Sequence, residues 1–270
     1  MSENRLAAWR EAYPRREQPL LMISLVLGDP FWGATLDYLH AVVEGGADIV
    51  ELVVPFSDPA FHGPVMRRAS IRATAEETSW QDVAQLVRDF RASEEAGDVP
   101  LIVSTYANRL LHFGERECIE LLASAGVDGL MVTDLPAEES KDLKDALEAK
   151  GLYLIHQVAA TTSLERFRRI ARDAKGLLVW TGHVGGGVSL ELEEFQSRMK
   201  SLRTYSLVPL VASMDIESSE EAVEVARAAH GVLLGSVLSW LIEGKGPGVE
   251  ERLRAFVADL RISLDSKALI

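Results

Sequence analysis

The chain has 270 residues, of which 47% are hydrophobic and 26% are charged. This is the composition of an ordinary globular protein, and it excludes a disordered, collagen-like or disulfide-scaffold chain. With 28 Lys and Arg against 41 Asp and Glu, the formal net charge is −13. Such a charge repels a phosphodiester backbone and argues against a nucleic-acid partner, but it leaves room for a small phosphorylated ligand in a local positive pocket.

The N-terminal region carries no sign of export. Its first 18 residues are charged throughout and lack the apolar core of a signal peptide. The longest apolar run, Leu20–Leu27, is far shorter than the ~20 residues that cross a bilayer. The only cysteine, Cys118, permits no disulfide within the chain. We therefore expect a cytoplasmic protein that does not contact membranes.

Short apolar runs alternate with longer amphipathic segments along the chain, after an N-terminal helix expected at about residues 3–14. The runs are rich in Val, Ile and Leu without strict alternation, which is typical of strands buried on both faces of a parallel sheet. The expected strands are Leu20–Leu27, Asp48–Val54, Pro100–Thr105, Asp128–Thr133, Leu152–Gln157, Gly176–Thr181, Val208–Ser213 and Gly231–Leu234. The expected helices between them include Ala34–Glu44, Trp80–Ala92, Glu115–Ala125, Ala137–Ala149, Leu164–Ala174 and Ser219–Ala229.

Eight strands that alternate with helices over about 250 residues predict an α/β fold, a single (β/α)8 TIM barrel. The competing fold, a doubly wound open sheet, usually has a glycine-rich turn after its first strand. Here that strand ends in Leu27-Gly-Asp-Pro30 instead. Because no linker interrupts the pattern, residues 1–270 are expected to form one domain.

Functional groups of such a barrel lie at the carboxyl ends of the strands and in the loops that follow. No lysine occupies such a position, which argues against imine chemistry. No metal-binding spacing of histidines is present either, so we expect neither a metal nor a cofactor. The candidates at these places are Asp29, Glu51, His62, Tyr106, Asn108, Asp134, His156, Gln157, Thr181, His183, Gly185–Gly187, Ser213, Asp215, Gly235 and Ser236.

Glu51 and His62 are the two catalytic candidates. Glu51 interrupts an apolar strand, where desolvation would raise its pKa into the range of a general acid or base. The same pattern also fits a structural glutamate bonded to a polar group of a neighbouring strand. His62 lies on the loop after that strand, although a loop histidine is often only solvated. Unless it is shifted, its pKa places its titration near pH ~6–7.

Two later loops are candidates for anion binding. The segment Thr181–Gly187 suits a mobile lid or an anion-binding nest, and equally a plain turn. Gly235 and Ser236 open a helix after the last strand, where many barrels bind phosphate. Gly-Ser is also an ordinary start of a helix, so both interpretations stay open.

The stretch Ala47–Pro59, which reads Ala-Asp-Ile-Val-Glu-Leu-Val-Val-Pro-Phe-Ser-Asp-Pro, resembles the signature of the tryptophan synthase alpha chain family. The similarity runs from about Ile23 to about Phe256. It implies a barrel that cleaves indole-3-glycerol phosphate into indole and glyceraldehyde 3-phosphate without a cofactor. It also implies a separate beta chain that receives the indole. Further matching segments are Leu27–Pro30, Tyr106–Asn108, Val127–Pro136 and Leu234–Ser236.

Transferred residue by residue, the resemblance makes Glu51 the acid/base glutamate. It places Tyr106 and Asp134 in the substrate pocket. Gly186, Gly235 and Ser236 match parts of the phosphate cradle. His183, on the expected lid, is a further candidate for substrate binding.

Three departures from the family pattern affect the expected substrate. His62 stands where the family has an aspartate that accepts the indole nitrogen's proton, and Gly185 stands where it has a lid threonine. Asp215 falls where a phosphate-facing glycine is expected. A carboxylate there would repel a phosphate by roughly 4 kcal/mol per charge pair at ~4 Å and an effective dielectric constant of ~20.

The sequence thus predicts a diverged carbon–carbon lyase that uses Glu51 and His62 as acid and base. Its expected substrate is a small aromatic, indole-like molecule without a terminal phosphate, and His62 would equally serve an isomerase or cyclase. Two alternatives stay open. One is an authentic indole-3-glycerol-phosphate lyase, and the other is a non-catalytic homologue that binds a ligand or a beta-chain-like partner.

Overall fold

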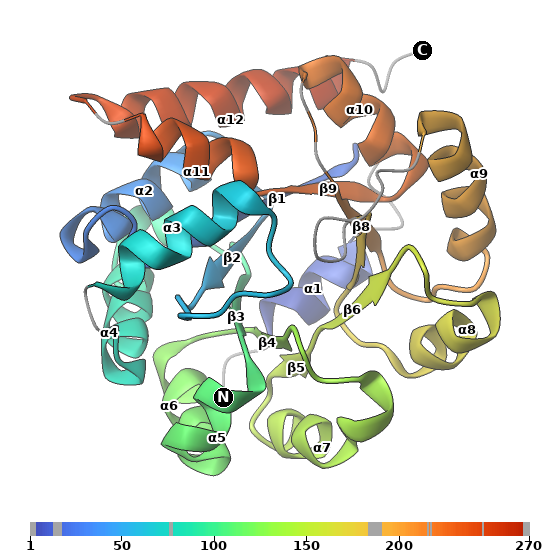
Figure 1. The fold of residues 1–270 in the computed structure, drawn as a ribbon, viewed down its shortest axis with the longest axis horizontal. Helices are drawn as coiled ribbons and strands as arrows, with labels where there is room; N and C mark the ends of the chain where they lie inside the picture. The colour runs from blue at the N-terminus through green and yellow to red at the C-terminus, as the bar shows by residue number, and fades with distance from the viewer. Residues whose placement is uncertain are drawn as a thin grey trace.

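A computed structural model of the protein describes residues 4–12, 18–75, 78–182, 191–214, 216, 218–244 and 246–266. Its strands form one parallel sheet in the order β5-β4-β3-β2-β1-β9-β8-β7-β6. The two ends of this order, β5 and β6, follow each other in the chain and together form one strand of the barrel. The sheet therefore closes into a barrel with helices around it (Figure 1). The strands are β1 (Leu20–Val26), β2 (Ile49–Val53), β3 (Leu101–Thr105), β4 (Gly129–Val132), β5 (Tyr153–Leu154), β6 (His156–Ala159), β7 (Leu178–Thr181), β8 (Leu210–Ser213) and β9 (Gly231–Leu234).

The described helices alternate with the strands, so the predicted (β/α)8 barrel is confirmed. The helices are α1 (Arg5–Ala12), α2 (Thr35–Glu44), α3 (Pro64–Thr74), α4 (Trp80–Arg91), α5 (Ala107–Phe113), α6 (Glu115–Ala125), α7 (Lys141–Ala149), α8 (Leu164–Asp173), α9 (Leu192–Arg203), α10 (Ser219–Ala228), α11 (Ser236–Glu243) and α12 (Val249–Ser266), with short 3-10 turns at Trp32–Ala34, Glu94–Ala96 and Ala137–Glu139. None of the described helices is both long and apolar enough to cross a membrane.

Several segments differ from the sequence-based expectation. The fifth strand is broken at Ile155 into β5 and β6. The helix expected from Ala137 begins only at Lys141, because residues 137–139 form a separate 3-10 turn. The sequence pattern also did not predict α3, which starts at Pro64, where a proline is favourable because the first helical N–H needs no partner.

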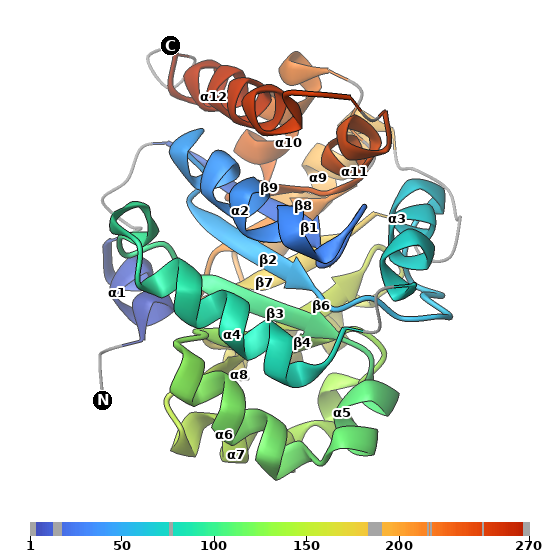
Figure 2. The ribbon, with the colours of Figure 1, turned by 90° about the vertical axis from the view of Figure 1, so that its left-hand side faces the viewer.

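The core has two parts. A larger cluster fills the space between the strands and the surrounding helices. A smaller cluster fills the inside of the barrel, with inward side chains from alternate strand positions; it comprises Leu6, Leu20, Met22, Ile49, Ile102, Met131, Ile155, Leu177, Val179, Val211 and Leu233. Leu6 comes from α1, which lies across the amino ends of the strands (Figure 2). Together with the inner cluster, α1 therefore covers the amino end of the barrel interior.

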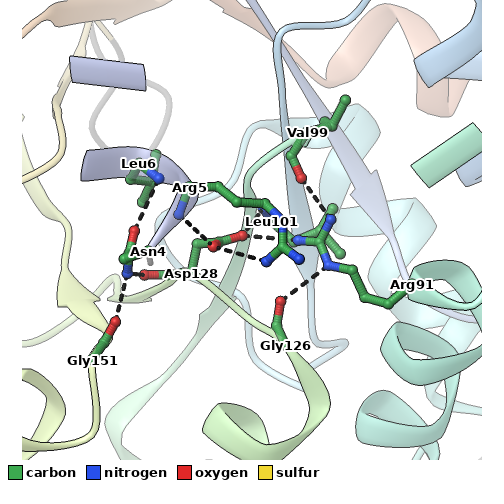
Figure 3. A network of polar contacts seen from close by, with 9 residues as sticks. All are labelled: Asn4, Arg5, Leu6, Arg91, Val99, Leu101, Gly126, Asp128 and Gly151. Atoms are coloured by element: carbon green, nitrogen blue, oxygen red, sulfur yellow. Dashed lines mark hydrogen bonds and ion pairs between the residues drawn. The ribbon is translucent and has the colours of Figure 1, made fainter. Parts of the chain in front are cut away.

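Asp128 organises the amino end of the barrel (Figure 3). Its carboxylate accepts hydrogen bonds from the Arg5 backbone N–H at 3.1 Å, the Leu101 N–H at 2.9 Å and the Arg91 guanidinium at 2.8 Å. Asn4 donates to the Asp128 carbonyl at 2.8 Å. This network ties α1 and α4 to the strands and closes that end with paired charges.

Candidate active site

A cavity of about 100 Å³ lies at the carboxyl ends of the strands. Its floor consists of inward strand side chains and its rim of the loops after β2, β8 and β9. The described residues that line it are Ser24, Glu51, Phe61, His62, Gly63, Met66, Met131, Thr133, Gln157, Thr181, Ser213, Met214, Ile216, Leu233, Leu234, Gly235, Ser236 and Val237. Both catalytic candidates from the sequence are in this set.

Glu51 reaches the cavity because strand residues alternate between the two faces of the sheet. Ile49, two residues earlier on β2, belongs to the inner cluster, so Glu51 points into the barrel as well. The register of β1 and β2 places Ser24 directly beside it. Only 4% of Glu51 is exposed, and burial raises the pKa of its carboxyl, while the hydroxyls of Ser104 and Ser24 lower it in part. This balance favours a protonated carboxyl, as a general acid requires.

His62 lies on the rim, on the loop between β2 and α3. The backbone N–H of His62 donates to the Pro59 carbonyl at 3.1 Å. The imidazole ring meets the Tyr106 ring edge-on at a centroid distance of 5.8 Å. Burial lowers the pKa of His62 to about 4, so the pKa is shifted and this imidazole does not titrate near pH ~6–7 in the free protein. Within the described residues its buried Nδ1 has no hydrogen-bond partner. At neutral pH the site thus holds an uncharged imidazole that a substrate group can engage.

Tyr106 and Asp134, expected in the pocket, do not line the cavity. Tyr106 is buried behind the rim, stacks on Phe56 at 4.8 Å and accepts a hydrogen bond from the Phe61 N–H at 3.2 Å. Burial raises the pKa of Tyr106 to about 12, so its hydroxyl stays protonated. Asp134 is exposed and accepts a hydrogen bond from the Ala107 N–H at 2.7 Å, at the start of α5. Both residues position loops around the cavity.

Gly235 and Ser236 line the cavity where α11 begins. A side chain at Gly235 has little room, because an added Cβ would lie 3.0 Å from the Ser24 Cβ and 3.2 Å from the Met66 Sδ. The other end of α11 is fixed by Glu243, which accepts hydrogen bonds from Arg68 at 2.7 Å and from Arg72 at 2.9 Å. The start of this helix is therefore held against the cavity.

Comparison with known proteins identifies the family. The family model of the tryptophan synthase alpha chain matches residues 12–265. This chain belongs to the tryptophan synthase alpha chain family. The alpha chain of Cupriavidus pinatubonensis is 35% identical over 90% of this chain and 92% of its own length. That of Laribacter hongkongensis is 33% identical over 98% of both chains.

Solved structures of tryptophan synthase share the fold. The alpha subunit from Legionella pneumophila superimposes with a TM-score of 0.88 at 32% identity, covering 98% of this chain and 100% of that chain. A chain of tryptophan synthase from Mycobacterium tuberculosis gives 0.85 at 26% identity, covering 97% and 98%.

Several residues expected from the alpha chain pattern lie outside the described part of the chain. They are His183, Gly185, Gly186 and Asp215. His156, by contrast, is described and does not line the cavity; it lines a cleft between α7 and α8 with Lys144 and Arg169. Among the described residues no group of three His, Cys, Asp or Glu side chains is arranged to hold a metal ion.

The sequence analysis missed three polar side chains of the floor, Ser24, Ser104 and Thr133. Ser24 and Thr133 line the cavity, and Ser104 acts on the Glu51 carboxyl. Each lies two residues after an inward apolar residue, namely Met22, Ile102 and Met131. Because strand side chains alternate between the two faces, knowing one residue that points into the barrel would have identified these three as pointing inward too.

Proposed function

We propose that this protein is a cofactor-independent carbon–carbon lyase that cleaves indole-3-glycerol phosphate by a retro-aldol reaction. The family match over residues 12–265 supports this alternative over a substrate without phosphate. The observation that carries the proposal is Glu51, a buried carboxyl with a raised pKa at the floor of the cavity. Such a group can protonate a carbon atom of an aromatic ring, which an ionised surface carboxylate does poorly.

The first step protonates the ring. Glu51 gives its proton to the ring carbon that bears the side chain, and the proton of the ring nitrogen passes to the neutral imidazole of His62. The ring becomes an imine, Glu51 becomes a carboxylate and His62 becomes a cation. The low pKa of His62 makes it a weak base alone, but the new Glu51 charge in the same cavity stabilises the imidazolium.

The second step breaks the carbon–carbon bond. The Glu51 carboxylate takes the proton of the adjacent side-chain hydroxyl, and a carbonyl forms at that carbon. The electron pair of the broken bond returns to the ring, whose nitrogen regains its proton from His62. Indole and glyceraldehyde 3-phosphate result, and both residues return to their starting states. The hydroxyls of Ser24 and Ser104 support the charged form of Glu51 between the two steps.

The phosphate end of this substrate fits the start of α11. The first N–H groups of a helix have no intrahelical partners and carry partial positive charge, so they bind anions. Gly235 and Ser236 bring them to the cavity.

The test is release of indole from indole-3-glycerol phosphate by the purified protein. Glu51→Gln keeps the shape and removes the titrating group, so turnover should fall by ~10²-fold or more. Glu120→Gln, which changes an exposed carboxylate on α6 outside the cavity, is the matched control and should retain the activity. Turnover by Glu51→Gln at the unmodified rate would disprove the assignment.

A substrate without a terminal phosphate is the second candidate. The described residues that line the cavity include no Lys or Arg, and Asp215 adds a carboxylate where the family pattern has glycine. If Asp215 faces the ligand, Asp215→Gly should lower the KM for indole-3-glycerol phosphate. The same change should leave the KM for indole-3-glycerol unaltered. Tight binding of the phosphate by the unmodified protein would favour the first candidate.

We also propose that a beta-chain-like protein docks over the mouth of the barrel. Phe61 and Leu111, on the loop after β2 and on α5, are 44% and 67% exposed. Large exposed apolar side chains beside a cavity are typical of an interaction surface. Mixing the protein with a tryptophan synthase beta chain and measuring the mass of the complex tests this. Phe61→Ser should weaken the complex, whereas Ile262→Ser, on α12, should not.

A further inference from the structure

The cavity floor is polar around most of its circumference. Most of the side chains that point into the barrel two residues after the apolar inner cluster, toward the carboxyl ends of the strands, carry hydroxyl or amide groups. These residues are Ser24, Ser104, Thr133, Gln157, Thr181 and Ser213. The hydroxyls of Ser104 and Ser24 act on the Glu51 carboxyl and lower its pKa in part, and Thr133 and Gln157 lie on the same floor.

The strand order divides this polar floor into two halves. Around the barrel, β4 lies across from β9, and the position shared by β5 and β6 lies across from β1. The α11 start follows β9, so Thr133 after β4 and Gln157 on β6 face the half of the cavity away from it. Thr133 and Gln157 also line a common smaller void of about 10 Å³, which places them side by side. If the anionic end of the substrate lies at α11, its ring lies against these two residues.

An unsubstituted indole matches this half of the cavity poorly. Its single hydrogen-bonding group is the N–H, which the proposed mechanism directs to His62. A carboxamide has two donor hydrogens and an acceptor oxygen, and a threonine hydroxyl adds a donor and an acceptor. Within the described part of the chain, neither the Gln157 amide nor the Thr133 hydroxyl is bonded to another protein group. Covering them with an apolar ring edge would remove water and leave them unpaired, which is unfavourable.

We propose that the preferred substrate is a derivative of indole-3-glycerol phosphate whose ring carries a further hydrogen-bonding group, such as a hydroxyl substituent or a second ring nitrogen, on the edge that faces Thr133 and Gln157. This rests on the proposed function only for the orientation of the substrate. It makes the two residues determinants of ring specificity, whereas Glu51 and His62 perform the proton transfers. The substrate class is thus a polar heteroaromatic ring joined to a glycerol phosphate side chain.

The test measures binding of free rings, so it does not depend on cleavage. Dissociation constants of indole, 5-hydroxyindole and 7-azaindole are determined by calorimetry for the unmodified protein and for a Thr133→Val, Gln157→Leu double variant. At least one polar ring should bind the unmodified protein about tenfold more tightly than indole, because a site with unpaired polar groups rejects a ligand that lacks partners for them. In the double variant this preference should fall to about twofold or less.

Ser124→Ala, which removes a hydroxyl at an exposed position on α6 outside the cavity, is the matched control, and it should retain the preference among the rings. Equal or tighter binding of indole by the unmodified protein would overturn the inference. So would a preference that the double variant retains, or a failure of all three rings to bind. Single Thr133→Val and Gln157→Leu variants replace the double variant if it does not fold. Ring preference without cleavage of any glycerol phosphate derivative would refute the lyase reaction and not this inference.

Discussion

Glu51 and Asp128 are both buried carboxylates, 4% and 2% exposed, and they lie at opposite ends of the same barrel. Asp128 accepts hydrogen bonds from two arginines and two backbone N–H groups. Among the described residues, the hydrogen-bonding groups that act on the Glu51 carboxyl are the hydroxyls of Ser104 and Ser24, and burial raises its pKa. A buried charge with full pairing stabilises a structure, whereas one without a cation tends to take up a proton. The fold therefore keeps Asp128 as an anion paired with arginines and leaves Glu51 able to exchange a proton.

The same contrast extends to the surroundings. At the amino end, α1 covers the inner cluster and Arg91 donates to the carbonyls of Gly126 and Val99 as well as to Asp128 (Figure 3). At the carboxyl end, His62 Nδ1 has no partner within the described residues. Unpaired polar groups at a cavity are expensive for folding and useful for binding. The proposed ligand site thus lies at the end of the barrel opposite the paired network, as is general for barrels of this type.

The largest expected effect on stability comes from Asp128, at the amino end of the barrel. Asp128→Asn leaves two arginines without their carboxylate and should lower the free energy of unfolding by about 3–5 kcal/mol. Chemical denaturation measures this change, and Asp89→Asn on the exposed face of α4 is the control. Activity per folded molecule should stay unchanged. A loss of less than ~1 kcal/mol would show that the network contributes little.

His62 should make the protein acid-sensitive. Its pKa falls from 6.5 to about 4 on folding, so between these values the unfolded chain binds a proton that the folded protein does not. Stability should therefore decline as the pH falls from 6.5 to 4, by up to about 3 kcal/mol, and change no further from this group below pH 4. His62→Gln should remove that part of the decline, and His112→Gln, at an exposed position on α5, should not. Parallel pH curves for the unmodified protein and His62→Gln would contradict the burial of this imidazole.

Glu51 should act on stability in the opposite sense at higher pH. Its pKa is raised above the ordinary 4.5, so above pH 4.5 the folded protein retains a proton that the unfolded chain has lost. The free energy of unfolding should thus fall as the pH rises through this window. Glu51→Gln should melt at a higher temperature than the unmodified protein at pH 8, with a smaller difference at pH 4. A variant that is less stable at pH 8 would mean that the carboxylate is paired, like Asp128.

The smallest expected effect concerns the start of α11. Gly235→Ala places a methyl group within 3.0 Å of Ser24 and 3.2 Å of Met66, so the helix start must move. We expect the KM for the phosphorylated substrate to rise about tenfold, equivalent to ~1.4 kcal/mol, with a smaller change in kcat. Gly244→Ala, at the other end of α11 and in ordinary van der Waals surroundings, is the control. Equal KM values for both variants would remove α11 from the binding site.

The candidate site was only partly predictable from the sequence. Glu51 stood out because a carboxylate is rare inside an apolar strand, and Gly235 with Ser236 because of their place after the last strand. Tyr106 and Asp134 occupy matching positions too, yet neither lines the cavity. The position after a strand places the Tyr106 backbone at the mouth of the barrel. The direction of its side chain, however, depends on packing against Phe56 and on the hydrogen bond from the Phe61 backbone.

By itself, the sequence determined the order and approximate bounds of the barrel strands, because runs such as Leu20–Leu27 can be buried only inside a sheet covered on both faces. It did not determine which residues of a strand point inward. When both faces are apolar, alternation is absent from the pattern, so Ser24, Ser104 and Thr133 gave no signal. Only closure of the barrel fixed their direction and brought Glu51 and His62 to one cavity. The burial that sets the pKa values of these two residues comes from strands and loops distant in the chain, which no local pattern encodes.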